Sequence, residues 1–197
     1  PRSAPGTTRG RISNPSPDEK LRLPAEWEGH EATWISWPRN ASDWPGKFAA
    51  IPWAFAEMAR RIAAGEILRV IVASSAHEVR ARRVLGRVGV DPGQLEFFRI
   101  PSDRGWTRDT GPITVLRGAR GRAEVVRFRF TAWARYPDWR RDDAVAPRAA
   151  EALGLPLVAA THAGRQVVLE GGAIEVNGRG TLITTEECLL DPGVQVR

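Results

Sequence analysis

The sequence predicts an α/β protein with many short strands, and three features support that prediction. β-branched runs such as residues 67–73 (ILRVIVA) are typical of buried strands. Other segments, such as residues 52–62, repeat their apolar side chains at helical spacing. Turn-forming Gly, Pro and Asn residues separate these segments, and no long linker follows residue 21. Strands and helices that alternate along one chain in this way indicate the α/β class.

The first half of the chain is predicted to contain three strands and two helices. Strands rich in β-branched or aromatic side chains are expected at residues 32–37, 67–73 and 95–100. The first helix should begin at Pro52, because proline fits the first helical turn, and should end at Gly65. The second helix is expected at residues 76–85, with Gly86 and Gly89 ending it. The chain then enters a loop before the second half.

The second half is predicted to contain a hairpin, a helix and further short strands. The hairpin joins residues 113–116 to residues 124–130 through a glycine-rich turn. A helix follows at residues 142–153, and Pro147 should kink or shorten it. Short strands are expected at residues 167–169, 173–176 and 181–184. The pair Asn177-Gly178, between the last two, carries the strongest hairpin signal in the sequence.

The two ends of the chain differ from its middle. Residues 1–20 are rich in Pro, Ser, Gly and Arg without a hydrophobic period, so we expect a flexible leader. Residues 21–197 are enough for one domain with a sizeable core. The chain begins without Met and ends without a helical closure. We therefore expect residues 21–197 to be the N-terminal part of a domain that is truncated at its C-terminal end.

Composition excludes several classes of protein. No stretch approaches the roughly 20 apolar residues that span a bilayer, so no membrane partner is expected. The single cysteine, Cys188, allows no internal disulfide and fits a reducing, cytoplasmic location. The net charge is +6, and 29 residues are basic, all of them Arg except Lys20 and Lys47. These residues are spread among acids rather than clustered, which argues against a nucleic-acid partner.

Two loops at predicted strand ends carry the candidate chemistry. The first is residues 106–112 (WTRDTGP), and the second is residues 169–172 (LEGG). Each has a structural alternative: Asp109 could cap backbone amides in a turn and pair with Arg108, and Glu170 could lie solvated at a bend. Taken together, the loops favour a site for a planar cation. A carboxylate accepts two N–H donors of a guanidinium side by side, and Trp106 could stack on its face.

The order of motifs resembles that of the agmatine deiminase family. Six motifs occur in the family order, covering about residues 21–193: 23–30 (LPAEWEGH), 33–38 (TWISWP), 106–112 (WTRDTGP), 141–143 (RDD), 169–172 (LEGG) and 184–190 (TTEECLL). The bacterial peptidyl-arginine deiminases share several of them. This resemblance implies a pentein fold, a fan of five ββαβ-type modules around a central pocket, of which the chain would supply about the first half.

The resemblance also implies a reaction. The family hydrolyses a guanidine, here agmatine, to a ureido group and ammonia, with no metal or organic cofactor. A Cys thiolate attacks the guanidinium carbon to form a thiouronium intermediate, and a His serves as general acid and base. Asp109 and Glu170 match acidic catalytic and substrate-binding positions, and Trp106 matches an aromatic residue of the pocket wall. The product, N-carbamoylputrescine, would enter putrescine and polyamine metabolism.

The chain departs from the family in ways that leave alternatives open. The family's His-Val-Asp motif and late Cys are absent, and Cys188 and the three histidines match no catalytic position, so the chain alone is expected to be inactive. Ala134 and Arg135 replace two glycines of a family loop. The alternatives are a peptidyl-arginine deiminase, a non-catalytic truncated homologue, and a basic nucleic-acid module centred on residues 127–141. The sequence leaves a homo-oligomer possible.

Overall fold

The computed structural model describes residues 20–119 and 121–193, and its first part is a three-stranded parallel sheet. The strands β2 (Ala32–Ser36), β3 (Ile67–Val72) and β4 (Leu95–Arg99) lie in the order β2-β3-β4. Two helices, α1 (Ile51–Ile62) and α2 (Ser75–Arg87), connect them. All five predicted elements of this part are confirmed. The predicted leader, residues 1–20, lies almost entirely outside the described residues.

The helix boundaries follow from local chemistry. Pro52 lies in the first turn of α1, where a missing N–H is tolerated. The Oγ of Ser74 accepts a hydrogen bond of 3.2 Å from the N–H of His77 and so caps α2. This helix continues through Gly86 to Arg87, so the prediction that Gly86 ends it is wrong. Gly89, the other glycine predicted to end the helix, has a positive φ of 77° and turns the chain away just after it.

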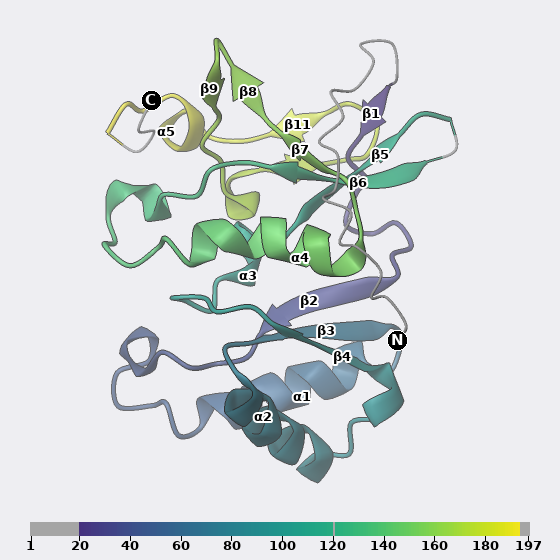
Figure 1. The fold of residues 1–197 in the computed structure, drawn as a ribbon, viewed down its shortest axis with the longest axis vertical. Coiled ribbons are helices and arrows are strands. Elements are labelled where there is room, and N and C mark those ends of the chain that lie inside the picture. The colour runs from purple at the N-terminus through teal and green to yellow at the C-terminus, as the bar shows by residue number, and fades with distance from the viewer. Residues whose placement is uncertain (1–19, 120, 194–197) are drawn as a thin grey trace, which may run out of the picture.

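Helices cover both faces of this sheet (Figure 1). On one face, Leu68, Val70 and Val72 pack against buried alanines and Leu85 of α1 and α2. On the other face, Ile71 packs against Val145 of a later helix, α4 (Val145–Leu153). Because both faces are covered, the central strand β3 is apolar at every position except Arg69.

The second part is a ββαβ unit. Strands β5 (Ile113–Arg117) and β6 (Arg122–Arg127) pair antiparallel, and after helix α4 (Val145–Leu153) the chain returns as β7 (Leu157–Ala159), parallel to β6. β1 (Leu21–Arg22) completes the sheet in the order β1-β5-β6-β7. Figure 1 shows α4 between the two sheets. Pro147 lies in the first turn of α4, so it shortens the helix without kinking it.

Two small hairpins and short turns complete the chain. The hairpin of β10 (Glu175–Val176) and β11 (Leu182–Ile183) confirms the Asn177-Gly178 prediction. The predicted strand at residues 167–169 is wrong; only Val168 makes an isolated bridge, to Arg129. An unpredicted hairpin precedes it, of β8 (Thr161–His162) and β9 (Arg165–Gln166). The remaining helical elements are η1 (Ala41–Asp43), η2 (Pro92–Gln94), α3 (Thr107–Thr110), η3 (Ala132–Ala134), η4 (Asp142–Ala144), η5 (Gly171–Ala173) and α5 (Glu186–Leu189).

None of the helices that the structure describes is both long and apolar enough to cross a membrane. Within the same residues, no group of three or more His, Cys, Asp or Glu side chains is arranged to hold a metal ion.

Candidate functional site

The two loops singled out in the sequence lie against each other. The first forms α3, which follows β4, and the second forms η5, which follows the β8-β9 hairpin; α3 and η5 are in direct contact. A Cβ on Gly171 would overlap the backbone carbonyl of Arg108, and a Cβ on Gly172 would overlap the carboxylate of Asp109. Both positions therefore need glycine for close approach, which explains the Gly-Gly pair.

Asp109 is half-buried in α3. Burial raises the pKa of its carboxyl group, while the N–H of Gly172, which donates to the carboxylate, and the charge of Arg108 oppose that rise. The guanidinium of Arg108 makes its ion pairs with Glu26 and Glu175, not with Asp109. The structural alternative for Asp109 had two parts. A backbone amide does contact its carboxylate, but the predicted ion pair with Arg108 is wrong.

Glu170 is buried, with 1% of its surface exposed, so the alternative of a solvated Glu at a bend is wrong. Burial raises the pKa of its carboxyl group, and the nearby charge of Asp109 raises it further. Its own backbone amide favours the ionised form, yet no donor among the described residues makes a hydrogen bond of normal geometry to either carboxylate oxygen. A buried carboxylate without donors is costly unless a cation or a donor satisfies it.

Asp109 and Glu170 therefore form a coupled pair of acids with spare acceptor capacity. Each raised pKa shows that the site disfavours a negative charge on the carboxylate. A bound cation would favour that charge instead. A guanidinium suits the pair because it presents flat, forked N–H donors.

Trp106 lies at the start of α3 within an aromatic cluster. Its ring centroid is 5.3 Å from that of Trp133 and 5.1 Å from that of Tyr136. Ala132 and Trp133 adopt positive φ angles of 51° and 57° although neither is glycine. Arg135, where the family carries glycine, has an ordinary φ of −102°. The substitution at position 135 is thus compatible with the loop, and its strain lies two or three residues earlier.

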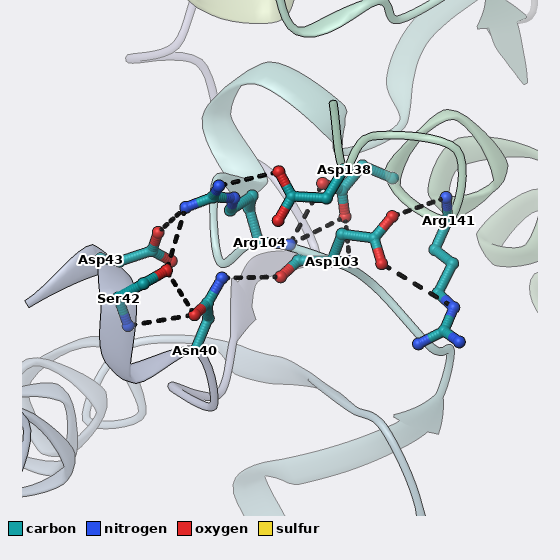
Figure 2. Close-up of polar contacts among 8 residues, drawn as sticks. Asn40, Ser42, Asp43, Asp103, Arg104, Asp138 and Arg141 are labelled. Atoms are coloured by element: carbon teal, nitrogen blue, oxygen red, sulfur yellow. Dashed lines mark hydrogen bonds and ion pairs between the residues drawn. The ribbon is translucent and has the colours of Figure 1, made fainter. Parts of the chain in front are cut away.

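Sequence reasoning gave no role to two residues that organise the loop before α3. The carboxylate of Asp142 is 1% exposed and accepts hydrogen bonds from the N–H of Asp103 at 2.7 Å and from that of Arg104 at 3.1 Å. Burial raises the pKa of Asp142 to about 6. Arg104 forms ion pairs with Asp43 and Asp138 (Figure 2). The RDD motif pointed to Asp142 without showing what it binds.

Two cavities border α3. The larger, of about 390 Å³, is lined mainly by apolar residues including Leu23, Trp34 and Ile174, and neither Asp109 nor Glu170 lines it. The smaller, of about 20 Å³, is lined in part by Asp109. We place the candidate site at the carboxylates, because buried acceptors without donors indicate a ligand more directly than cavity size does.

Comparison with known proteins bears on the family of the chain. Residues 22–195 match the family model of the Porphyromonas-type peptidyl-arginine deiminases. The chain is 39% identical over 189 residues to an agmatine deiminase of Pseudomonas aeruginosa (strain LESB58), covering 91% of this chain and 48% of that protein. It is 38% identical over 177 residues to the agmatine deiminase of Ectopseudomonas mendocina (strain ymp), covering 87% and 45% respectively.

Solved structures are likewise matched over about half of their length. The agmatine deiminase of Enterococcus faecalis superposes with a TM-score of 0.75 at 30% identity, covering 89% of this chain and 46% of that one. The agmatine deiminase of C. jejuni shares the fold, with a TM-score of 0.73 at 23% identity, covering 92% and 50%. The chain thus spans about half the length of the relatives that it matches, and the expected partial pentein fold is confirmed. The chain belongs to the Porphyromonas-type peptidyl-arginine deiminase family, and the relatives named above are agmatine deiminases.

Proposed function

We propose that this chain is the N-terminal part of a deiminase that hydrolyses agmatine to N-carbamoylputrescine and ammonia. One observation carries the proposal: Glu170 is buried beside Asp109 with both carboxylate oxygens lacking a hydrogen-bond donor among the described residues. A guanidinium would supply those donors and a positive charge at once. The likeness to agmatine deiminases over about nine tenths of the chain supports the choice of guanidine.

Each site residue has a distinct role in this proposal. Asp109 and Glu170 accept N–H donors of the substrate and keep its guanidinium protonated, which leaves the central carbon electrophilic. Trp106 stacks on the flat face of the cation. A Cys thiolate attacks the carbon, ammonia leaves after gaining a proton from a His, and water hydrolyses the thiouronium to the ureido product. We assign that Cys and His to a further part of the protein.

The surface of the C-terminal region supports the idea that residues 21–197 belong to a longer domain. Leu182 and Ile183 of β11 are 51% and 68% exposed, and Leu190 after α5 is 61% exposed. Neighbouring apolar side chains with such exposure suit a face that another part of the same fold covers. In this proposal the enzyme works in the cytoplasm, in putrescine metabolism.

The alternative substrate is a peptidyl arginine, and the alternative role is non-catalytic. The comparison that decides between the substrates is ammonia release by the complete protein from agmatine, free arginine and an N-acyl-arginine amide. Preferential turnover of agmatine supports the proposal, and preference for the arginine amide supports a peptidyl-arginine deiminase. If none of the three compounds releases ammonia, the result supports a non-catalytic homologue.

Two substitutions test the site itself. Asp109→Ala and Glu170→Ala are each expected to lower turnover at least ~100-fold, since loss of a buried charged contact costs several kcal/mol. Asp91→Ala is a matched control, because Asp91 also accepts a hydrogen bond from a glycine N–H, that of Gly93 at 2.9 Å, but lies before η2 outside the site loops. Near-normal turnover in both site variants would refute the assignment of these carboxylates.

A further inference from the structure

Arg104 joins loops from three parts of the chain. Its Nη1 contacts the carboxylate of Asp43 in η1, and its Nη2 lies 2.8 Å from Oδ1 of Asp138, in the loop after η3. Figure 2 shows the guanidinium between these carboxylates, which belong to residues 61 and 34 positions away in the sequence. The Arg104 side chain is only 12% exposed, so solvent screens its ion pairs weakly.

The same guanidinium also contacts the aromatic cluster. Its Cζ lies 5.2 Å from the centroid of Trp106 and 5.2 Å from that of Tyr136. The two rings meet edge to face, with centroids 5.1 Å apart. These distances are within the range of cation–π contacts. The position of the Trp106 ring thus depends on where Arg104 is held.

The backbone of this loop has a separate anchor. The carboxylate of Asp142 accepts hydrogen bonds from the N–H groups of Asp103 and Arg104, three and two residues before Trp106. Asp142 therefore fixes the path of the main chain. The orientation of the Trp106 ring must then be set by side-chain contacts. Arg104 is the charged residue that makes such a contact.

We propose that Arg104 is a positioning residue that orients the Trp106 ring toward the guanidine at Asp109 and Glu170. This inference rests on the proposed function, because it gives Trp106 the task of stacking on that guanidine. Carboxylates hold both Nη atoms of Arg104, so we assign it no direct contact with the substrate. Arginine suits the role because its rigid fork can hold two acids while its flat face lies against a ring.

Kinetics of the complete protein with agmatine test the proposal. Arg104→Gln is expected to raise KM about 10-fold, the size of a desolvated cation–π contact, and to change kcat by less than about 3-fold. The ring binds substrate and transition state alike, which is why KM carries the effect. Adding Arg104→Gln to Trp106→Ala should cause no further loss, because Arg104 acts through the ring.

Arg69 provides a matched control. It is also 12% exposed, it pairs with Glu31 at 2.6 Å and Glu96 at 2.8 Å, and its Cζ lies 5.7 Å from the centroid of Trp34. It belongs to β3, outside the loops that carry Asp109 and Glu170, so Arg69→Gln should leave KM unchanged. Equal KM values for Arg69→Gln and Arg104→Gln, or additive losses in the double variant, would overturn the inference.

A direct measurement of the ring separates this inference from the proposed function. If wild-type protein releases no ammonia, the proposed function fails, but the ring can still be followed by fluorine NMR of 5-fluorotryptophan-labelled protein. The Trp106 signal is assigned by its loss in Trp106→Phe. It should shift or broaden in Arg104→Gln and stay in place in Arg69→Gln; an unchanged signal in Arg104→Gln would refute the positioning role.

A second variant covers the case in which Arg104→Gln does not fold. The Asp138 side chain is 43% exposed, so Asp138→Asn should fold while releasing one Nη of Arg104. The Trp106 signal is expected to move in this variant too, and KM to rise by less than in Arg104→Gln. If both the signal and KM match those of wild type, Arg104 does not position the ring.

Discussion

The backbone N–H of Gly172 donates to the carboxylate of Asp109, and a Cβ on Gly172 would overlap that same carboxylate. Gly172→Ala should therefore push the Asp109 side chain aside while the main chain of the loop stays in place. We expect turnover of agmatine by the complete protein to fall at least ~10-fold, since a small misplacement of a substrate-holding group is costly. Urea unfolding should show little change in stability.

Gly171→Ala, unlike Gly172→Ala, should lower the stability of the protein, because its Cβ would overlap the backbone carbonyl of Arg108. Backbone cannot rotate away, so we expect the free energy of unfolding to fall by about 1–3 kcal/mol. Gly86→Ala in α2 is the control: a Cβ there has no neighbouring heavy atom within 4 Å, and we expect a gain of about 0.5–1 kcal/mol. Full stability of Gly171→Ala would mean that η5 and α3 do not pack as described.

The sequence was most informative where side-chain patterns reflect burial. The strands β2, β3 and β4 carry β-branched and aromatic residues, and prolines and glycines mark the helix ends, so this part was predicted closely. The hairpin of β8 and β9 was missed because Thr161, His162 and Arg165 are exposed and show no apolar alternation. Its turn has positive φ angles at Ala163 and Gly164, and only the glycine gives a turn signal.

The candidate site was predictable only in part. The sequence predicts Asp109 and Glu170 as a pair of acids, and the structure brings their loops together, although their catalytic role stays a prediction. The ion pairs of Arg104 could not be predicted. Its partners are 61 and 34 residues away on loops, and no hydrophobic period fixes how such loops face each other.

Glu170→Gln should make the protein more stable at neutral pH while abolishing turnover. The pKa of Glu170 is raised above 4.5, so between pH 4.5 and that raised pKa the folded state keeps a proton that the unfolded state has released. Wild-type stability therefore falls as pH rises through this window. The Glu170→Gln variant has no such loss, and we expect it to be about 1–3 kcal/mol more stable than wild type above the window, measured by urea unfolding.

The pH dependence provides the check on Glu170. The advantage of Glu170→Gln should disappear near pH 4, where the wild-type carboxyl group is protonated in both states. Glu187→Gln is the control, because Glu187 is 72% exposed and its substitution should stay within about 0.5 kcal/mol. A Glu170→Gln advantage that is the same at pH 4 and pH 8 would contradict the account.

His77 should make the protein sensitive to acid. Its Nδ1 accepts the N–H of Ala73 at 3.2 Å, so Nε2 carries the proton and donates to the carbonyl of Pro38, also at 3.2 Å. Burial lowers the pKa of His77 below 6.5, so below pH 6.5 the unfolded state binds a proton that the folded state resists. Stability is therefore full above pH 6.5 and is lost as the pH falls through the lowered pKa.

His77→Asn isolates this effect, because its Oδ1 can still accept from Ala73 while the contact with Pro38 is lost. We expect it to be about 1 kcal/mol less stable than wild type at pH 7.5 and closer to wild type at pH 5. His162→Asn in the exposed hairpin should stay close to wild type at pH 7.5. A constant gap between His77→Asn and wild type from pH 7.5 to 5 would show that His77 does not cause acid sensitivity.

Asp142 should be needed as a hydrogen-bond acceptor rather than as a charge. Asp142→Ala leaves the N–H groups of Asp103 and Arg104 without their partner, and we expect a loss of about 2–4 kcal/mol in urea unfolding. Asp142→Asn keeps an acceptor oxygen and should lose less than half of that. Equal losses in the two variants would mean that the charge of Asp142 matters more than its hydrogen bonds.

The pH dependence of Asp142→Asn follows from the burial of this carboxyl group. Because burial raises the pKa of Asp142 from 3.8 to about 6, the folded wild type holds a proton between these values that the unfolded state has lost. Wild-type stability falls as pH rises through that range, so Asp142→Asn should compare most favourably with wild type above pH 6 and least favourably near pH 4. An unfolding series from pH 4 to 8 measures this, and a gap that widens above pH 6 would contradict it.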